Sequence, residues 1–252
     1  MSKIKPTEEI LCGIHPVREA LRAGKRKVYA ILVSKERSKP RLAEILECAR
    51  ERAIPVEITD ADSLDSITEN ARHQGVAARV SSFAMVRAEG IVKEMPEGVS
   101  DRFVLVIETL EDPQNLGALI RTAVCAGVDY IMIPKERSAS PSPAVSRASA
   151  GAMEHADISL ITNTASLLRQ LKTLGFWVAG LDGQGETPLF EADLKGNLVL
   201  VVGGEHRGIR PLVKKECDFL VSLPIKAGVT SLNASVAGGI AMYEALRQRQ
   251  LN

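Results

Sequence analysis

The chain has 252 residues, of which 45% are hydrophobic and 25% are charged. These proportions are ordinary for a globular protein and exclude collagen-like, disordered and low-complexity chains. The formal net charge is only +1, so the charge of the whole chain does not single out a nucleic-acid binder.

The N-terminal part is more basic than the rest. Residues 1–52 carry 13 Lys/Arg against 7 Asp/Glu, a local charge of +6. Much of it comes from two clusters, residues 25–27 and 35–41. A basic face of this kind suits a phosphate backbone, although charge alone fits a solvated surface equally well.

Membrane and metal sites are not expected. No apolar run approaches the roughly 20 residues that span a bilayer, and the first residues lack the apolar core of a signal peptide. The cysteines are far apart, with no CxxC pair, and are expected to be reduced thiols in a cytoplasmic protein. They are Cys12, Cys48, Cys125 and Cys217.

Residues 1–83 alternate between short helical and strand patterns and predict a small α/β domain. Helices are expected at 16–21 (closed by Gly24), 42–49 and 62–71, and strands at 28–33, 54–59 and 76–80. Residues 84–101 then lose periodicity and gather Gly90, Pro96 and Gly98, which is typical of a linker.

Residues 102–252 predict a second domain with a parallel sheet. Near-continuous apolar runs at 103–107, 130–133, 158–161, 176–181, 198–202 and 219–223 are joined mostly by helix-length segments. Such runs indicate parallel strands covered on both faces. Because ligands bind beyond the carboxyl ends of such strands, chemistry is expected in the loops after Ile107, Val202 and Leu223.

Several common sites are excluded by their missing motifs. No GxGxxG follows a strand, and neither GxxxxGK[ST] nor GxSxG occurs. The four histidines have no HExxH or other metal-ligand spacing, so no metal site is expected. An unrelated nucleotide-binding enzyme on a doubly wound sheet is therefore disfavoured.

The first candidate loop is 108–122, which leaves a strand and enters a helix. Asn115 can cap that helix, Gly117 permits close approach to the backbone, and Arg121 lies two turns further on. Asn115 and Arg121 are not on one helix face, so tertiary structure must bring them together. Helix capping plus a surface arginine explains the same residues without any chemistry.

The other candidate loops are 202–209 and 223–235. In the first, Gly203 and Gly204 precede Glu205 at a strand end, a turn whose backbone can hydrogen-bond a flat ligand. The second leads into a final helix, 236–250, whose early glycines cost about 1 kcal/mol each relative to alanine. Close packing against a backbone or a ligand would explain them.

Together these loops resemble the three signature motifs of the SpoU family of RNA ribose 2′-O-methyltransferases, in the SPOUT superfamily. The order and spacing match over residues 103–250. The matching residues are Asn115, Gly117 and Arg121; Gly203, Glu205 and Gly208; and Pro224, Ser231, Leu232, Asn233 and Ser235. Two departures, His206-Arg207 and Lys226-Ala227, add positive charge near the site.

The N-terminal domain is similar to the ribosomal L30e-like substrate-binding domain that many SpoU enzymes carry. The residues that carry this likeness are 13–21 and 73–77. We therefore expect an RNA substrate-binding domain at 1–83, a linker at 84–101 and a SpoU methyltransferase domain at 102–252. The basic N-terminal face is expected to dock the RNA.

The family resemblance implies S-adenosylmethionine as methyl donor, a trefoil knot in the C-terminal domain and a homodimer. It implies 2′-O-methylation of RNA, with a guanosine of the peptidyl-transferase P loop of 23S rRNA as the expected target. A guanosine of transfer RNA is an alternative target. A catalytically inactive RNA-binding module is an alternative of another class.

The resemblance also assigns roles to residues. Arg121 is the expected catalytic residue, and because an arginine stays charged in proteins we expect it to act electrostatically. Asn115, Glu205, Ser231 and Asn233 are expected to orient the ribose and Arg121. The cofactor is expected to bind at Gly203, Gly204, Leu223, Ile225, Leu232 and Ser235.

Overall fold

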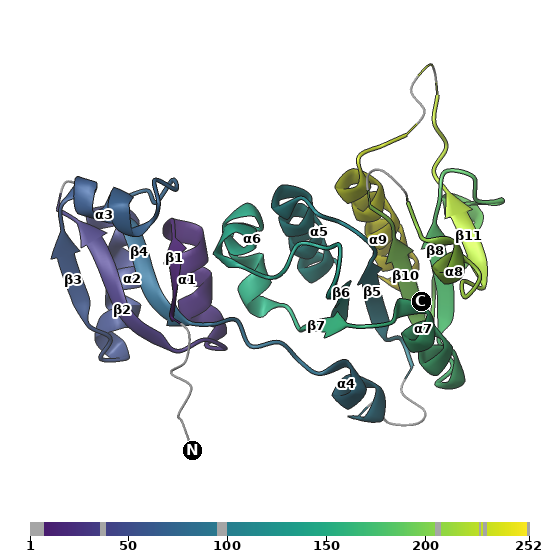
Figure 1. Cartoon of the computed structure of the whole chain (residues 1–252), viewed down its shortest axis with the longest axis horizontal. Coiled ribbons are helices and arrows are strands. Elements are labelled where there is room, and N and C mark those ends of the chain that lie inside the picture. The colour runs from purple at the N-terminus through teal and green to yellow at the C-terminus, as the bar shows by residue number, and fades with distance from the viewer. Residues whose placement is uncertain are drawn as a thin grey trace. The chain divides into compact units, whose positions relative to one another are not determined.

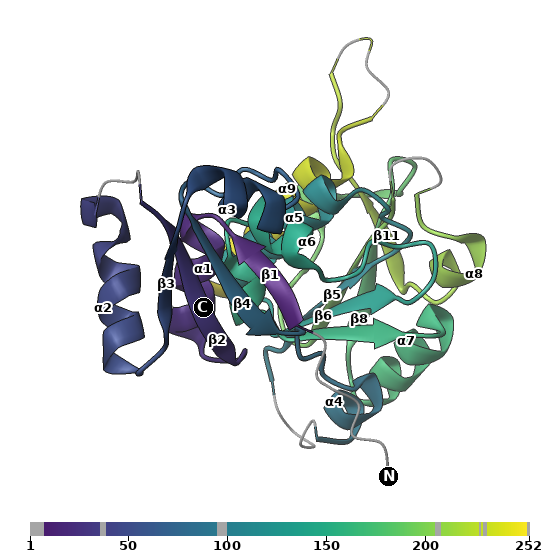
Figure 2. The same ribbon diagram turned by 60° about the vertical axis from the view of Figure 1, so that its left-hand side comes forward.

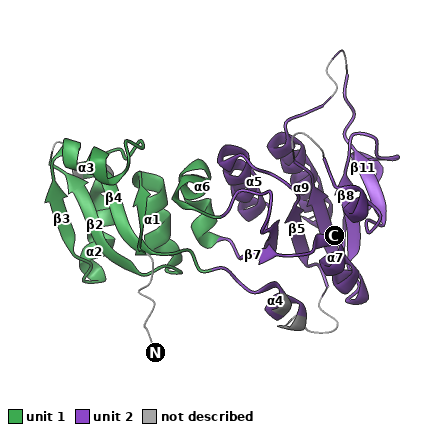
Figure 3. Cartoon of the chain, in the orientation of Figure 1, with its two compact units in different colours: residues 1–84, 141–155 green, residues 85–140, 156–252 purple. Residues whose placement is uncertain are grey.

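The computed structural model describes residues 8–35, 39–94, 100–204, 208–226, 228 and 231–250. It divides into two compact units, here called unit 1 (residues 1–84 and 141–155) and unit 2 (residues 85–140 and 156–252) (Figure 3). Unit 1 is therefore discontinuous in sequence. The sequence pattern does not predict that residues 141–155 belong to it.

Unit 1 is built on a four-stranded sheet with the order β1-β4-β2-β3 (Figure 2). The strands are β1 (Glu8–Cys12), β2 (Val28–Ser34), β3 (Val56–Thr59) and β4 (Val76–Ser81). β2 and β3 are parallel, whereas β4 runs antiparallel to both β1 and β2. The three predicted strands of this domain are confirmed. β1 was missed because its first two residues are glutamates.

Helices cover both faces of this sheet. They are α1 (Ile14–Ala23), η1 (Lys39–Leu42), α2 (Ala43–Glu51) and α3 (Ala61–Ile67). α1 and α2 contribute Leu21 and Ile45 to the main core, and α3 buries Leu64 on the opposite side. Gly24 ends α1 with a φ of 64°, as predicted. The inserted segment forms α6 (Pro143–Ala148) and η2 (Ala152–His155), which pack against α1 and β1.

One predicted basic cluster is not free at the surface. Arg26 is only 5% exposed and pairs with Glu9 and Glu154, while its Nε donates to the Ser81 carbonyl. Lys25 donates to the carbonyl of His155. A buried arginine needs such partners, because an unpaired charge in the interior is costly. Residues 25–27 therefore contribute less to a basic face than their charges suggest.

Unit 2 contains a seven-stranded sheet in which every described pairing is parallel, as predicted. Its strands are β5 (Phe103–Ile107), β6 (Tyr130–Pro134), β7 (Ile158–Ile161), β8 (Trp177–Leu181), β9 (Thr187–Pro188), β10 (Leu198–Val202) and β11 (Phe219–Ser222). The order is β7-β6-β5-β10-β8-β11-β9. All residues of β5 and β10 are buried, which explains their uninterrupted apolar runs.

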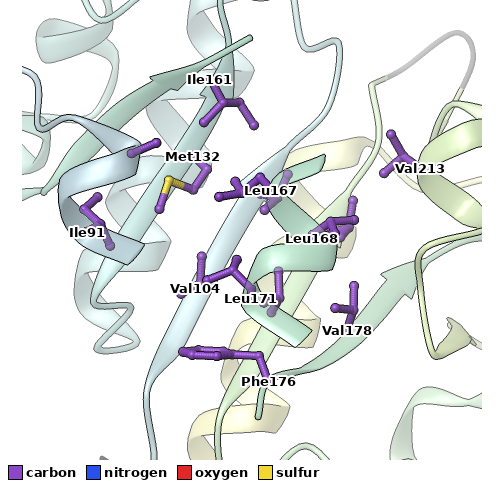
Figure 4. Close-up of a cluster of buried hydrophobic side chains, with 14 of the residues drawn as sticks. Ile91, Val104, Met132, Ile161, Leu167, Leu168, Leu171, Phe176, Val178 and Val213 are labelled. Carbon is purple, nitrogen blue, oxygen red and sulfur yellow. The ribbon is translucent and has the colours of Figure 1, made fainter. Parts of the chain in front are cut away.

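The two faces of this sheet are covered by different helices. Unit 2 contains α4 (Ala88–Glu94), α5 (Pro113–Cys125), α7 (Thr164–Thr173), η3 (Leu189–Glu191), α8 (Pro211–Lys214) and α9 (Ala234–Gln250). α4, α7 and α8 share a core with alternate residues of the strands (Figure 4). α5 and α9 lie side by side, and α9 also contacts β8 and β10 (Figure 1). No helix within the described ranges is long and apolar enough to cross a bilayer.

The predicted linker contains a helix, which corrects the expectation of an aperiodic segment at 84–101. α4 buries Ala88 and Ile91 in the core of unit 2. Just before it, the Val86 N–H donates to the carbonyl of Ile158 at 2.9 Å. Two apolar residues three apart are too short a pattern to predict a helix, and tertiary contacts stabilise this one.

Candidate functional site

The strand order brings four loops to one edge of the sheet. β5, β10, β8 and β11 are consecutive neighbours and all parallel, so the loops after Ile107, Val202, Leu181 and Ser222 leave the same edge. Sequence reasoning expected chemistry after β5, β10 and β11. The loop after β8 is a fourth contributor that it missed.

A pocket of about 260 Å³ lies at this edge. Five of the six residues predicted to bind the cofactor line it, together with the predicted catalytic Ser231. The lining consists of Leu181, Asp182, Gly183, Val202, Gly203, Gly204, Gly208, Leu223, Ile225, Ser231, Leu232, Ala234 and Ala237. Apolar walls with a few polar groups are typical of small-molecule sites. The sixth predicted residue, Ser235, is not part of this wall.

The glycines after β10 are required by close backbone contacts. A β-carbon on Gly203 would overlap the backbone of Gly208, and one on Gly204 would overlap the carbonyl oxygen of Thr109. Gly204 and Gly208 also form an isolated antiparallel bridge, with the Gly208 N–H donating to the Gly204 carbonyl at 3.1 Å. The predicted Glu205 lies outside the described residues, as do His206, Arg207 and Ala227.

Asn115, Asn233 and Ser235 form a polar cluster between the first turns of α5 and α9. The Asn115 Oδ1 accepts hydrogen bonds from Asn233 Nδ2 at 3.0 Å and from Ser235 Oγ at 3.4 Å. Asn233 Oδ1 in turn accepts from the Ser235 N–H at 2.9 Å and from its hydroxyl at 2.6 Å. The first and third motifs therefore meet through side-chain hydrogen bonds.

The cap of α5 is Asp112, which corrects the prediction that Asn115 caps this helix. The Asp112 carboxylate accepts from the N–H groups of Gln114 and Asn115, at 3.1 Å and 3.2 Å. Pro113 occupies the first helical turn, where its missing N–H costs nothing. Because Asp112 caps the helix, the Asn115 side chain can contact α9.

Arg121 belongs neither to the pocket nor to the polar cluster of Asn115, Asn233 and Ser235. It is exposed on α5 and is not among the residues that line the pocket. None of the residues described by the structure pairs with its guanidinium. Its five N–H donors are therefore open to an anionic group. The structure does not bring Arg121 to Asn115 within one chain, as their spacing on the helix already indicated.

An ion pair between the buried Glu108 and the partly exposed Arg210 fixes the base of the loop after β10. Glu108, which directly follows β5, is fully buried. Its carboxylate accepts two hydrogen bonds from Arg210, at 2.6 Å and 2.9 Å, and one from the Thr164 hydroxyl at 2.5 Å. The bond to Glu108 raises the pKa of Arg210. Sequence reasoning missed this pair, because the two residues are a hundred positions apart.

Asp182 is a second acidic residue that the sequence analysis missed. It lines the pocket, and its carboxylate lies 2.5 Å from the Lys214 ammonium and 3.0 Å from the Gln184 N–H. Burial acts to raise its pKa, but these bonds outweigh burial and lower it. Asp182 is therefore ionised at neutral pH. An Asp-Gly pair directly after a strand was the available signal.

Two family models match the chain. The one described as the SpoU rRNA Methylase family matches residues 102–243. The one described as RNA 2'-O ribose methyltransferase substrate binding matches residues 10–86. Together they span most of both units.

Relatives with a named activity are similar over nearly the whole length. The chain is 39% identical over 240 residues to the 23S rRNA (guanosine-2'-O-)-methyltransferase RlmB of Xanthomonas campestris, covering 95% of this chain and 96% of that one. It is also 39% identical over 244 residues to the protein of the same name from Pseudomonas putida, covering 96% and 98%.

Solved structures share the fold. An AdoMet-bound rRNA methyltransferase from Sinorhizobium meliloti has a TM-score of 0.77 at 25% identity, over 95% of this chain and 87% of that one. The SpoU methyltransferase AviRb from Streptomyces viridochromogenes, in complex with AdoMet, has a TM-score of 0.78 at 23% identity, over 96% and 90%.

The Glu108–Arg210 pair generates a stability prediction. Arg210→Ala leaves a fully buried carboxylate without its cation, and we expect the free energy of unfolding to fall by about 3 kcal/mol. The matched control is Arg169→Ala, which removes the exposed pair with Glu216 and should cost less than about 1 kcal/mol. Urea unfolding followed by the fluorescence of Trp177, the single tryptophan, measures both. Equal losses in the two variants would contradict this account.

Proposed function

The chain belongs to the SpoU rRNA methylase family, and from this membership we propose that it methylates a ribose 2′-hydroxyl in RNA with S-adenosylmethionine as donor. The observation that carries the proposal is the pocket at the carboxyl ends of β10 and β11. Its walls contain residues of the second and third family motifs, and it has the mixed apolar and polar character that a nucleoside-like cofactor needs.

The proposed substrate is a guanosine of 23S rRNA, in the peptidyl-transferase P loop. Support comes from relatives of that activity that match more than nine-tenths of the chain, and from the substrate-binding family model over residues 10–86. A guanosine of transfer RNA is the rival target. We infer a cytoplasmic location from the proposed substrate.

The residues of the pocket fit the proposed cofactor. Leu223, Ile225 and Leu232 offer apolar surface for a flat base, and Gly203 and Gly204 leave backbone groups accessible beside it. Ser231 adds a hydroxyl at the rim. When bound, S-adenosylmethionine supplies an electrophilic methyl group on a sulfonium. The protein must hold the ribose oxygen in line with that methyl, and such orientation is worth up to about 11 kcal/mol.

We assign catalysis to Arg121, and we assign the orientation of the ribose to other residues of the three motifs. The exposed guanidinium suits stabilisation of the developing alkoxide or a grip on the adjacent phosphate. Asn115 and Asn233 hold each other through their 3.0 Å hydrogen bond and present a fixed polar surface to the ribose. Glu205 and Ser231 are proposed to orient the ribose as well.

A homodimer is part of the proposal. α9 packs Ala241, Met242 and Ala245 inward, yet Val236, Ile240 and Tyr243 are 51%, 36% and 51% exposed on its other side. Their spacing of four and three residues forms one apolar stripe along the helix. An apolar stripe on the surface of a helix indicates a protein interface, and a second copy of this chain is the proposed partner.

The trefoil knot implied by the family resemblance also remains a proposal. Support for it comes from the SpoU family model over residues 102–243 and from the likeness of the fold to solved SpoU methyltransferases.

Transfer of labelled methyl from S-adenosylmethionine tests the function. We expect label on unmodified 23S rRNA, at one guanosine ribose of the P loop, and none on bulk transfer RNA. Label on transfer RNA would keep the activity and overturn the target. Absence of cofactor binding would overturn the activity itself.

Arg121→Ala is expected to lower kcat by about 10²–10³-fold, because removing one preorganised charge partner of a transition state costs this much. The Kd for S-adenosylmethionine should stay unchanged, since Arg121 does not line the pocket. Single-turnover rates and cofactor titration check the two quantities. Arg169→Ala is the control and should behave as wild type; near-normal turnover of the Arg121 variant would contradict its assignment.

Ile240→Asp is expected to halve the molar mass in solution, because a charge in an apolar interface is left unpaired. Light scattering coupled to size exclusion measures it. Leu212→Asp is the control, since Leu212 is 71% exposed on α8 and should not affect assembly. A dimer that persists in the Ile240 variant would remove α9 from the proposed interface.

A further inference from the structure

The loop that joins α3 to β4 in Figure 1 contributes most of the residues of a second pocket, in unit 1. This pocket has a volume of about 340 Å³. It is lined by Ile14, Asp65, Asn70, Ala71, Arg72, His73 and Gln74. Residues 73–77 carry part of the likeness to the substrate-binding domain, but the proposed methyl transfer makes no use of them. Most of the lining is polar, which does not suit an apolar peptide segment.

The backbone of this loop is held in an unusual conformation. Glu69, Asn70 and Gln74 have φ values of 53°, 59° and 54°, in the left-handed region that non-glycine residues rarely adopt. Such conformations persist only when surrounding contacts enforce them, and they gather at functional sites.

His73 supplies two of the contacts that hold this loop. Its Nδ1 accepts the Gly75 N–H at 2.9 Å, so the proton is on Nε2, which donates to Asp65 Oδ1 at 2.9 Å. Next to it, Gln74 Oε1 accepts the Ile14 N–H at 3.2 Å. The loop is therefore fixed to both α3 and α1, and His73 is a positioning residue.

Three polar groups of the pocket are available to bind a ligand. Within the described ranges, the Asn70 amide, the Arg72 guanidinium and the Gln74 amide nitrogen have no hydrogen-bond partner. Asn70 and Arg72 are exposed. An amide can both donate to and accept from the edge of a nucleobase, and a guanidinium binds phosphate.

Arg72 is the arginine of unit 1 that lines this pocket. Most of the others are engaged in ion pairs, such as Arg22 with Glu44 and Arg79 with Glu57. Arg52, Arg72 and Arg147 have no such pair among the described residues, and of these Arg147 donates to Cys12 Sγ. An unpaired guanidinium beside a polar pocket offers a charge that internal partners do not neutralise.

We propose that the loop at residues 68–75 binds one unpaired nucleotide of the RNA substrate. Arg72 contacts its phosphate, and Asn70 and Gln74 contact the edge of its base. The volume is at the lower end of the roughly 300–1,000 Å³ of small-molecule sites, which suits a single nucleotide rather than a duplex. Proteins read RNA sequence mainly at such splayed, unpaired bases. The inference rests on the proposed function, since it requires an RNA substrate.

The test compares Arg72→Ala with Arg52→Ala, an exposed arginine of the same unit outside the pocket. We measure the Kd for an unmodified 23S rRNA transcript over a range of salt concentrations, and the KM and kcat for methyl transfer. Arg72→Ala should raise Kd and KM about tenfold, as expected for loss of a charge-assisted bond. It should lower the slope of log Kd against log salt by about 0.7. kcat and the Kd for S-adenosylmethionine should not change.

Arg72→Lys retains the charge and should restore the salt slope, which a merely structural role would not predict. Wild-type affinity of Arg72→Ala for the transcript, or equal weakening by Arg52→Ala, would overturn the proposal. So would a loss of affinity confined to ribosomal particles, which would indicate a protein contact. If the wild type transfers no methyl yet Arg72→Ala still weakens RNA binding, the proposed function fails and this inference stands.

Discussion

The position of β10 determines most of what this molecule can do. It lies between β5 and β8, hydrogen-bonded in parallel register to both, with every residue buried. A strand in this position must be apolar on both faces. The turn at its end must fit closely against its own later residues, Gly208 and Ile209, and against Thr109 of the loop after β5. The glycines at 203 and 204 meet that requirement. The same constraint creates the pocket, because the end of β10 meets those of β8 and β11.

Polar contacts then fix what the sheet brings together. Glu108 continues β5 into the interior, and Arg210 reaches it from beyond the loop after β10. The loop after β5 and the loop after β10, far apart in sequence, are thereby held together. On the other face of the sheet, the Asn115–Asn233 hydrogen bond joins the starts of α5 and α9. Apolar packing stabilises the sheet and its helices. A small number of hydrogen bonds and ion pairs then fix the positions of the loops at the end of the sheet.

The sequence predicted the parts of the fold that depend on local pattern. Apolar runs such as 103–107 and 198–202 specify buried parallel strands, and Gly24 specifies a helix end. Elements stabilised by distant contacts were not predicted. β9 has only two residues, and α4 depends on packing against the core of unit 2.

The candidate site was predictable to a similar degree. The loops after β5, β10 and β11 followed from the rule for parallel sheets, and the motifs supplied the residues of the pocket wall. Asp182 and Arg210 did not follow, because their roles exist only once separate strands and loops are assembled. Capping was misassigned to Asn115 because Asp112 and Asn115 are both good caps, and only the fold decides between them.

The discontinuity of unit 1 has a consequence for synthesis on the ribosome. Its sheet is complete once β4 has emerged, but Arg26 still lacks Glu154, which is translated only after β5, α5 and β6 of unit 2. The nascent chain therefore cannot finish its first unit before it has begun the second. Until then Arg26 has Glu9 and the Ser81 carbonyl but lacks its second carboxylate, and a pause in translation between residues 84 and 155 would prolong that interval.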